Sequence, residues 1–374
     1  LESAPFGLLV LPTLSNTVDA AVRADWVASQ IVDAEARQAH VKAIVEAVQK
    51  GGYKGLSLEY GGLGADHRQP FTAFVHELAA ALHGEGKLLT VRVDAPALVD
   101  GVWNTAGYDW AALGQAADLV RIPALTEPAA YAPGGAMEQV LRLATSQVNR
   151  AKLQLVISAY SHEQVGEERR AMIYGDALSL ASCTLQAEGD TTVLPGTKVA
   201  VKLANLGSGL KQDADSGHTI FVFRDASGVE HKVWVENAAS VARKLALAGQ
   251  FSLHGVAIDD LAGTANDAQI WETVRVARTS SARGAAAAAG TRYSVVWKVV
   301  GRDGAVVDEG VSPADQPVIN WTAAEEPGDY TLSVAISADG GQSTVGEASS
   351  LALVVPSPTP SPTPTNTPTP APTA

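Results

Sequence analysis

The sequence is poor in cysteine, in basic residues and in long apolar runs, and each shortage excludes a class of protein. Its 374 residues include one cysteine, Cys183, so a disulfide within the chain and a Cys/His zinc cluster are excluded. No apolar run reaches the roughly 18 residues that a membrane span needs. Only 27 Lys and Arg stand against 40 Asp and Glu. The resulting net charge of −13 repels phosphate backbones, so nucleic acid is not an expected partner.

The sequence does have a high hydrophobic content of 46%. Over residues 1–278, short apolar runs alternate regularly with longer amphipathic segments. Short apolar runs predict strands, and amphipathic segments between most of them predict helices. Strands that alternate with helices are typical of parallel βαβ units, so we predict an α/β fold. The predicted strands are 7–14, 55–60, 87–94, 118–125, 152–160 and 254–260.

Four parts are predicted along the chain. Within residues 1–278, the interval 161–236 consists of turn-punctuated β segments and predicts a β-rich insertion before the last strand. The small-residue stretch 279–290 is typical of a linker. Residues 291–355 have the length and strand rhythm of an immunoglobulin-like β sandwich. The Pro/Thr-rich stretch 356–374 predicts an extended, disordered tether of the kind found outside cells.

Polar side chains follow the predicted strands, at the positions where a parallel barrel places its chemistry. Glu59 and Asp259 are the strongest catalytic candidates. Two interpretations of them remain open: they line a sugar pocket, or they cap turns and face solvent. Trp103 lies in the loop LVDGVWNTAGYD and is suited to stack on a sugar ring. The candidate substrate-binding residues are Asn16, Tyr60, Asp94, Trp103 and Tyr160. No metal-binding, phosphate-binding or dinucleotide motif is present, so no cofactor is expected.

Several stretches, in order along the chain, together resemble glycoside hydrolase family 18, in particular its bacterial spore-cortex and cell-wall branch. GYKGLSLEYGGL (52–63) lies where that family has its strand-four signature D-G-x-D-x-D-x-E. FTAFVHELAAALHGEGKLLTVRV (71–93) and YDWAALGQAADLVRIPAL (108–125) look like the fifth and sixth strands with their preceding helices. HKVWVENAASVARKLALAGQFSLHGVAI (231–258) is similar to the run into the eighth strand. The resemblance covers residues 7–275 and implies a (β/α)₈ barrel.

The resemblance also implies a mechanism, in which the signature Glu is the general acid and the last Asp holds the substrate's own N-acetyl nucleophile. This sequence departs from the motif at each of these positions. The catalytic Glu falls on Gly61, which has no proton to give. The last Asp falls on Glu59, and the eighth-strand Trp falls on Asp259. The first and middle Asp residues fall on Lys54 and Ser57, and the sixth-strand Tyr falls near Leu125.

Two functions are therefore kept. The first is a non-catalytic module, a pseudoenzyme that binds chitin, peptidoglycan or another GlcNAc polymer or serves a structural role at a cell surface. The second is a hydrolase of such polymers in which Glu59, helped by Asp259, is a rewired acid and base. Both place the protein outside the cell. The chain begins LESAPFGLLVL, without methionine or a visible signal peptide, so we expect a signal upstream.

The resemblance makes one further prediction about the sheet. The first predicted strand lines up with the third strand of the family, so the first two βα units of the barrel are expected to be absent. An eight-stranded barrel cannot close with six strands, and we predict an open sheet with two edges. The side chains expected to be under-packed near the break are Leu8, Val10, Val256 and Ile258.

Overall fold

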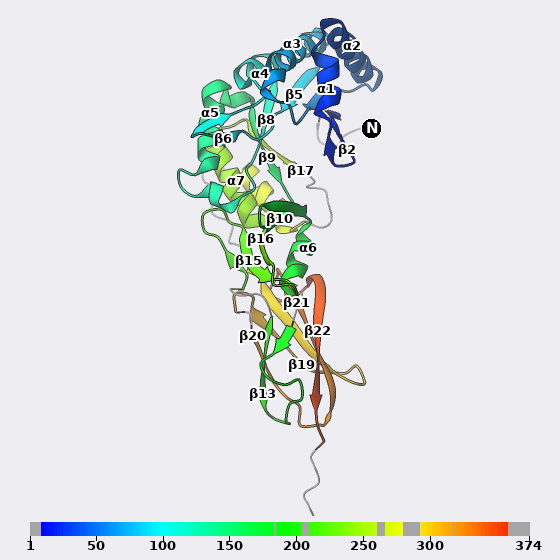
Figure 1. The fold of residues 1–374 in the computed structure, drawn as a ribbon, viewed down its shortest axis with the longest axis vertical. Coiled ribbons are helices and arrows are strands. Elements are labelled where there is room, and N and C mark those ends of the chain that lie inside the picture. Colours follow the sequence, from blue (N-terminus) through cyan, green and yellow to red (C-terminus); the bar gives the residue numbers. More distant parts are fainter. Residues whose placement is uncertain are drawn as a thin grey trace, which may run out of the picture. The chain divides into compact units, whose positions relative to one another are not determined.

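A computed structural model describes residues 9–182, 185–203, 209–259, 266–279, 292–316 and 318–357 (Figure 1). Contacts within the chain divide it into two compact units. Unit 1 consists of Leu1–Ala177, Gln212–Ile220 and Lys232–Thr291, and unit 2 of Leu178–Lys211, Phe221–His231 and Arg292–Ala374. Among the described residues, no helix is both long enough and apolar enough to cross a membrane.

The central feature of unit 1 is a six-stranded sheet with the order β1-β4-β5-β8-β9-β17. All five strand pairs are parallel. The predicted α/β barrel class is thus confirmed as an open half-barrel, whose edge strands are β1 and β17. The strand bounds are β1 (Thr13–Ser15), β4 (Gly55–Glu59), β5 (Leu88–Arg92), β8 (Leu119–Pro123), β9 (Leu153–Ser158) and β17 (Gly255–Asp259).

The strand predicted at 7–14 is shorter and later than expected. Strand β1 begins at Thr13, and residues 1–8 lie outside the described part of the chain. The edges are less well packed than the middle, as predicted. Val10 is 36% exposed, and Val256 and Ile258 are half-buried, whereas Leu155 on the neighbouring strand is fully buried. Leu8 lies outside the described residues.

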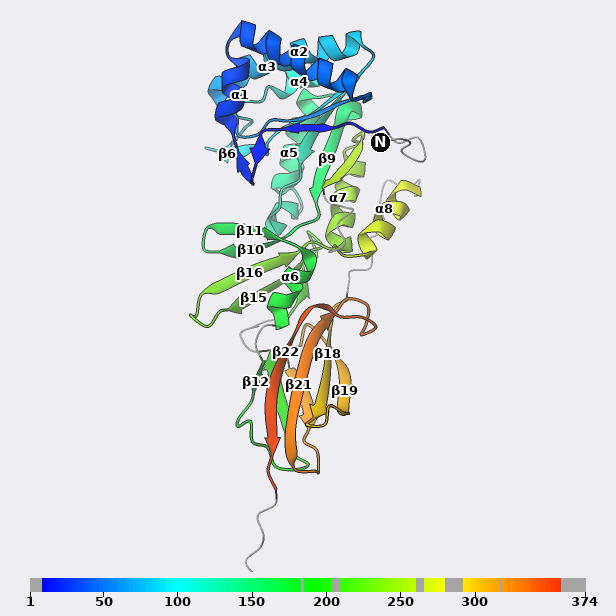
Figure 2. The same ribbon diagram turned by 90° about the vertical axis from the view of Figure 1, so that its right-hand side faces the viewer.

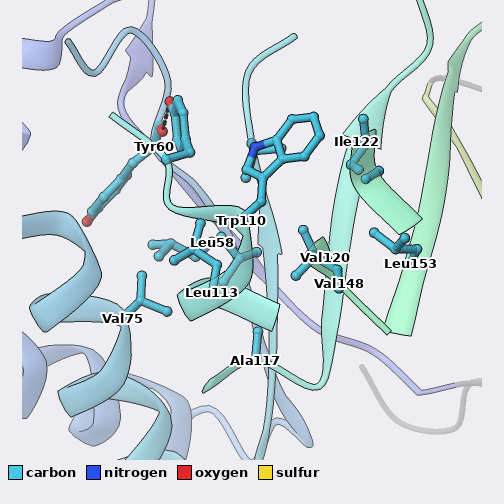
Figure 3. Packing of buried hydrophobic residues seen from close by; sticks show 14 of the residues in the cluster. Leu58, Tyr60, Val75, Trp110, Leu113, Ala117, Val120, Ile122, Val148 and Leu153 are labelled. Carbon is cyan, nitrogen blue, oxygen red and sulfur yellow. Dashed lines mark hydrogen bonds between the residues drawn. The ribbon is translucent and has the colours of Figure 1, made fainter. Parts of the chain in front are cut away.

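Helices cover one face of the sheet. The longest two are α2 (Ala34–Lys50) and α3 (Arg68–Gly84). Helix α2 begins at the N-cap Asp33, whose side chain accepts hydrogen bonds from two backbone N–H groups of the first turn. In Figure 3, Leu58 of β4 lies between the helices that carry Val75 and Leu113. The remaining helices are α1 (Ala24–Ile31), η2 (Ala65–His67), α4 (Trp110–Ala116), η3 (Pro128–Tyr131), α5 (Ala136–Gln147), η4 (Arg150–Lys152), α6 (Tyr174–Ser179), η5 (Leu180–Ser182), α7 (Ala238–Gln250) and α8 (Gln269–Thr279).

Two short hairpins follow the two strands that flank β4. Strands β2 (Thr17–Val18) and β3 (Ala21–Val22) come after β1, and strands β6 (Ala97–Val99) and β7 (Val102–Asn104) come after β5. The order β1-β4-β5 therefore brings a hairpin to each side of the loop that leaves β4. Both hairpins lie at the carboxyl end of the sheet, the end that carries the predicted site.

The β segments between β9 and β17 contribute to both units. In unit 1, β10 (Ser161–Val165) pairs antiparallel with β11 (Glu168–Met172) and with β16 (Glu230–Val235). In unit 2, β13 (Lys198–Leu203) pairs antiparallel with β20 (Val318–Thr322), which lies far along the chain. The interval 161–236, predicted as one insertion, is therefore divided. Strands β14 (Lys211–Gln212) and β15 (Thr219–Arg224) complete it.

Unit 2 contains two sheets, of which the three-stranded one combines strands from two separate parts of the chain (Figure 2). One has the order β12-β13-β20, with β12 at Leu185–Ala187. The other has the order β19-β18-β21-β22, with bounds Val306–Pro313, Ser294–Gly301, Gly328–Ser337 and Val345–Val355. Strand β13 joins the C-terminal part because its alternating apolar residues find partners there, with Val199 opposite Trp321. The predicted linker lies outside the described residues except for Thr279, and so does the tether beyond Ser357.

Candidate functional site

The side chains of the half-barrel separate into an apolar face and a polar face. Because side chains alternate along a strand and parallel strands pair in register, Ser57 and Glu59 lie on the same face as Thr90 and Arg92. Leu56 and its equivalents on the other strands face the helices. We call the polar side the inner face. Its polar residues are Thr13, Ser15, Ser57, Glu59, Thr90, Arg92, Arg121, Gln154, Ser158 and Asp259, and the same registers place the apolar Leu119, Pro123, Val156 and Ala257 on this face.

Ion pairs bring the two predicted catalytic carboxylates to one arginine on the inner face. Arg92 Nη1 lies 3.0 Å from Asp259 Oδ2 and 3.5 Å from Glu59 Oε2. A second guanidinium, that of Arg121, lies 3.9 Å from Glu59 Oε1. Arg121 also donates to Ser57 Oγ (2.9 Å) and to Gln154 Oε1 (3.1 Å). The two carboxylates and two guanidiniums balance in charge, so the inner face is polar and neutral.

The contact between Arg92 and Asp259 shows how strongly the sheet curls. Arg92 is on β5 and Asp259 on β17, and the strands β8 and β9 lie between them. In a flat sheet, three strand spacings of ~4.8 Å would separate the two backbones by about 14 Å. The 3.0 Å contact therefore requires the outer strands to bend toward this face. The guanidinium of Arg92 thus links a carboxylate of β4 to one of β17.

The charged groups of the inner face remain in contact with solvent. The side chains of Glu59, Arg92 and Asp259 are 23%, 29% and 37% exposed. Burial lowers the pKa of Arg121, the neighbouring carboxylates of Glu59 and Asp259 oppose that shift, and Arg92 adds to it. An arginine pKa lies so far above neutrality that Arg121 stays charged at physiological pH. The side chain of Glu59 thus lies beside two guanidiniums, whereas a general acid of this kind lies in an apolar setting.

Gly61 occupies the position of the catalytic Glu in the family 18 signature. Two side chains hold the backbone there by hydrogen bonds. Asn16 accepts a hydrogen bond from Gly61 N and donates one to Gly61 O, both at 2.9 Å. Asp94 Oδ2 accepts from Gly62 N at 2.7 Å. A Cβ placed on Gly61 would meet Asp94 Oδ1 at 3.2 Å and the Val22 side chain at 3.7 Å. The hairpin β2–β3 and these two polar residues therefore occupy the space beside position 61.

Two of the predicted substrate-binding residues, Asn16 and Tyr60, are buried in contacts with the protein itself. Asn16 is 4% exposed, and both the oxygen and the nitrogen of its side-chain amide hydrogen-bond to the backbone of Gly61. Tyr60 is 5% exposed, stacks near Phe74 and contacts His40 Nε2 at 2.8 Å through its hydroxyl, so the structure places it in the helix-side core rather than on the inner face (Figure 3). Alternation alone predicts this, because Tyr60 follows Glu59 directly.

Trp103 and Tyr160 are not among the ion-paired groups just described. Trp103 is half-buried on β7 and lines a surface pocket of about 350 Å³ together with Arg68, Asn104 and Gln147. Tyr160 follows β9, is half-buried, and its backbone N–H donates to Ser158 Oγ at 3.1 Å. The structure thus brings Glu59 and Asp259 together through ion pairs with Arg92. It brings Asn16 and Asp94 together through their hydrogen bonds to the backbone of Gly61 and Gly62. It does not join Trp103 to either pair by any described contact.

A second charged cluster lies in unit 1 at the start of α7 and is fully buried. Glu236 Oε2 contacts Lys244 Nζ and lies 3.1 Å from His218 Nε2, and Ser240 Oγ donates to Glu236 Oε1 at 2.7 Å. Burial by itself would raise the pKa of Glu236, but Lys244 and His218 lower it to about 2. Burial lowers the pKa of His218, against the pull of Glu236. Each of these three side chains is at most 4% exposed, so the cluster ties β16 to α7 rather than facing a ligand.

Sequence reasoning missed the arginines of the inner face. It examined the residues after each strand, whereas Arg92 and Arg121 lie within strands. The signal was present in KLLTVRVD, where Thr90 and Arg92 alternate with apolar residues in a strand expected to be apolar on both faces. Among the described residues, no group of three or more His, Cys, Asp or Glu is arranged to hold a metal ion.

Comparison of the sequence with models of known protein families finds no match. A chitinase from Chromobacterium violaceum ATCC 12472 is 26% identical, with a TM-score of 0.57 over 73% of this chain and 80% of that chain. The spore cortex-lytic enzyme SleL of Bacillus megaterium QM B1551 is 19% identical, with a TM-score of 0.56 over 72% of this chain and 59% of that chain. The predicted resemblance to the family 18 fold is confirmed by these structures.

Among curated proteins, the chain resembles one from Bacillus subtilis (strain 168), YdhD, whose name describes a sporulation-specific glycosylase. The two are 20% identical over 252 residues, which is 66% of this chain and 56% of YdhD. The chain thus spans about half the length of that relative. The likeness to the solved structures shows a fold of the chitinase-like type.

Proposed function

We propose that the chain is a non-catalytic glycan-binding module that acts outside the cell on a GlcNAc polymer such as chitin or peptidoglycan. The support for the ligand class is the likeness to a chitinase and to spore cortex-lytic enzymes. The support for an extracellular setting is the same likeness, together with the Pro/Thr-rich C-terminal stretch of the sequence.

The proposal that the module is non-catalytic is supported by the contacts around Gly61. Position 61 offers no side chain, and Asn16 and Asp94 hold its loop while Val22 lies beside it. The adjacent carboxylate, Glu59, is engaged by Arg92 and Arg121. A glycosidase of this type needs a positioned proton donor, and Gly61 has no side chain to supply one.

One observation favours the second candidate, a rewired hydrolase. Glu59 and Asp259 contact the same nitrogen of Arg92, so the two acids lie close together at the mouth of the half-barrel. Two neighbouring carboxylates are the usual equipment of a glycosidase. In this alternative, glycan binding would displace Arg92 and leave Glu59 free to take up and deliver a proton.

The two candidates are separated by assaying binding and hydrolysis on the same protein. The full chain is mixed with insoluble chitin and with peptidoglycan, and co-sedimentation is measured beside the release of reducing ends from N-acetylchitohexaose. We expect co-sedimentation and no release. Glu59→Gln serves as the diagnostic variant, with Glu46→Gln on the exposed face of α2 as its control. Hydrolysis that Glu59→Gln abolishes and Glu46→Gln does not would replace the proposal with the rewired hydrolase.

A further inference from the structure

A groove of about 640 Å³ lies between helices α2 and α3. The two helices lie side by side in the layer that covers the sheet, on the side away from the inner face (Figure 2). The apolar lining of the groove comes from Val41 and Val45 of α2 and from Ala80 and Ala81 of α3. Val45 and Ala81 are half-buried and Ala80 is exposed, so the groove has an apolar floor that is open to solvent.

The shape of the groove fits a helix better than a strand. Helix α2 lines it from Gln38 to Glu46, about 12 Å at 1.5 Å per residue, which is roughly two helical turns. Ala80 and Ala81 have small side chains, so a third helix can approach α3 closely and place its side chains between the rows of α2 and α3. A strand would find no backbone partners, because the backbone groups along both helices are bonded within the helices.

The charges around the groove are mainly acidic. Glu46, Glu77 and Glu85 line it, and Lys42 is the single cation among its lining residues. Lys42 Nζ lies 3.9 Å from Glu46 Oε1, and the two side chains are 78% and 63% exposed, so this pair is weak. Glu85 is exposed and has no ion-pair partner within the described part of the chain. The groove therefore carries net negative charge, which complements a cationic partner.

Glu77 is fixed at the groove and has one oxygen left over. Arg37 Nε donates to Glu77 Oε1 at 2.9 Å, and Arg37 Nη1 donates to the backbone oxygen of Ile31 at 3.1 Å. Glu77 Oε2 is buried and has no hydrogen-bond partner among the described residues. Buried acceptors are normally satisfied by protein, water or a ligand, so this oxygen suits a donor on a side chain that enters the groove.

We propose that the groove between α2 and α3 binds an amphipathic, cationic helix of a partner protein. An apolar stripe of that helix would pack on Val45 and Ala80, and its Lys or Arg side chains would pair with the glutamates, Glu77 Oε2 among them. A second copy of this chain fits poorly, because a two-fold dimer would place one acidic groove against another. This inference does not rest on the proposed function, since the groove and the inner face are on opposite sides of the sheet.

The test is fluorescence anisotropy with the full chain and a stapled helical peptide of three Lys-Leu-Ala-Ala repeats, in which leucines form one stripe beside the lysines. Its Glu-Leu-Ala-Ala counterpart is the control probe. Ala80→Trp fills the groove without a change in charge and is expected to weaken binding at least tenfold. Ala47→Trp replaces an exposed alanine of α2 that does not line the groove, and it is expected to keep the affinity of the parent chain.

A second pair of variants tests the charge. Glu85→Lys is expected to weaken binding by about threefold, the size of one exposed ion pair. Glu309→Lys, on the exposed strand β19, makes the same change in net charge and is expected to leave the affinity unchanged. The affinity of the parent chain should also fall between 0.05 M and 0.5 M NaCl.

Each outcome decides for or against the groove. Binding of the cationic peptide that Ala80→Trp and Glu85→Lys weaken, and that both control variants leave intact, supports the proposal. Equal affinity for all four variants would show attraction to the acidic chain as a whole and would overturn it, as would equal affinity for the acidic peptide or no binding at all. In sedimentation velocity, a dimer of the chain alone that Ala80→Trp dissociates would assign the groove to a second copy instead. Co-sedimentation with chitin or peptidoglycan is scored separately, so either proposal can fail while the other stands.

Discussion

Glu59 and Glu236 are both glutamates paired with two basic side chains, yet their surroundings give them different roles. Glu59 is 23% exposed and its nearest cation is 3.5 Å away. The side chain of Glu236 is 4% exposed and contacts Lys244 and His218 directly. In the buried cluster, Glu236 is held by direct contacts with Lys244, His218 and Ser240, whereas the inner face leaves arginine donors unused. Burial with direct ion pairing therefore marks the structural cluster, and partial exposure with spare donors marks the candidate site.

The largest expected effect comes from breaking the buried cluster. Lys244→Met removes the cation beside Glu236 and leaves a buried carboxylate without its main partner. Loss of one member of a buried ion pair typically costs about 3–5 kcal/mol. Urea unfolding followed by circular dichroism should show a loss of this size. Lys42→Met, on the exposed part of α2, should change the unfolding free energy by less than about 0.5 kcal/mol. A loss below about 1 kcal/mol for Lys244→Met would show that water enters the cluster.

Acid should weaken the same cluster without any substitution. The folded-state pKa of Glu236 is about 2, against an ordinary value of 4.5, so its stabilisation is present above pH 4.5 and is lost as the pH falls toward 2. This shift corresponds to about 3 kcal/mol. The pKa of His218 is also lowered, so its stabilisation is complete above its ordinary value of 6.5 and declines as the pH falls below it.

The measurement is the urea midpoint between pH 7.5 and pH 3. It should fall steadily with acidification in the parent chain, and a Glu236→Gln variant should lose most of the decline below pH 4.5. A parent chain whose midpoint is constant over this range would contradict the assigned pKa directions.

The contrast between the two clusters also shows what the sequence could predict. The packing of helices against the sheet could be predicted from the spacing of apolar residues. Val41, Ile44 and Val48 recur at helical spacing, so their burial on one side of α2 depends on the local sequence alone. The open order of the six strands followed from the resemblance to a known barrel. The pairing of β13 with β20 did not follow, since nothing in either segment specifies a partner more than 100 residues away.

The inner-face site was predicted in part. Glu59 and Asp259 were identified from their positions at strand ends. Their bridge through Arg92 depends on the curl of the sheet, which brings β5 and β17 together and which no local pattern encodes. Asn16 and Asp94 were predicted to bind a ligand because they are polar residues that follow predicted strands. Only the structure shows that they bind the backbone of Gly61 and Gly62 instead.

A smaller effect is expected from opening the inner-face network. Arg92→Met removes the cation shared by Glu59 and Asp259, but water reaches both carboxylates, so the loss should be about 1 kcal/mol. Because the pairs are partly exposed, salt should screen them. The difference between Arg92→Met and the parent chain should therefore shrink between 0.05 M and 0.5 M NaCl, whereas the loss from Lys244→Met should not. Equal salt dependence for the two variants would remove the distinction between the clusters.

The smallest effect is expected from Glu59→Gln, which keeps the side-chain shape and removes only the charge. The nearest guanidinium contacts of Glu59 are 3.5 and 3.9 Å long, and the amide can still accept the hydrogen bond from Ser57 Oγ at 3.3 Å. Arg92 keeps Asp259 as a partner at 3.0 Å, so no cation is stranded. Partly exposed pairs of this kind contribute about 0–1 kcal/mol, and we expect a change in unfolding free energy within about 0.5 kcal/mol.

The same measurement on Glu236→Gln at pH 7 should give several times that loss, because Lys244 would then be buried without a counter-charge. If Glu59→Gln were instead as destabilising as Glu236→Gln, Glu59 would have to be in a dry interior in solution. Its arginine contacts would then be structural, as those of the buried cluster are. In that case the spare donors of Arg92 would be enclosed by protein, and the inner face would have no open side from which a sugar could approach.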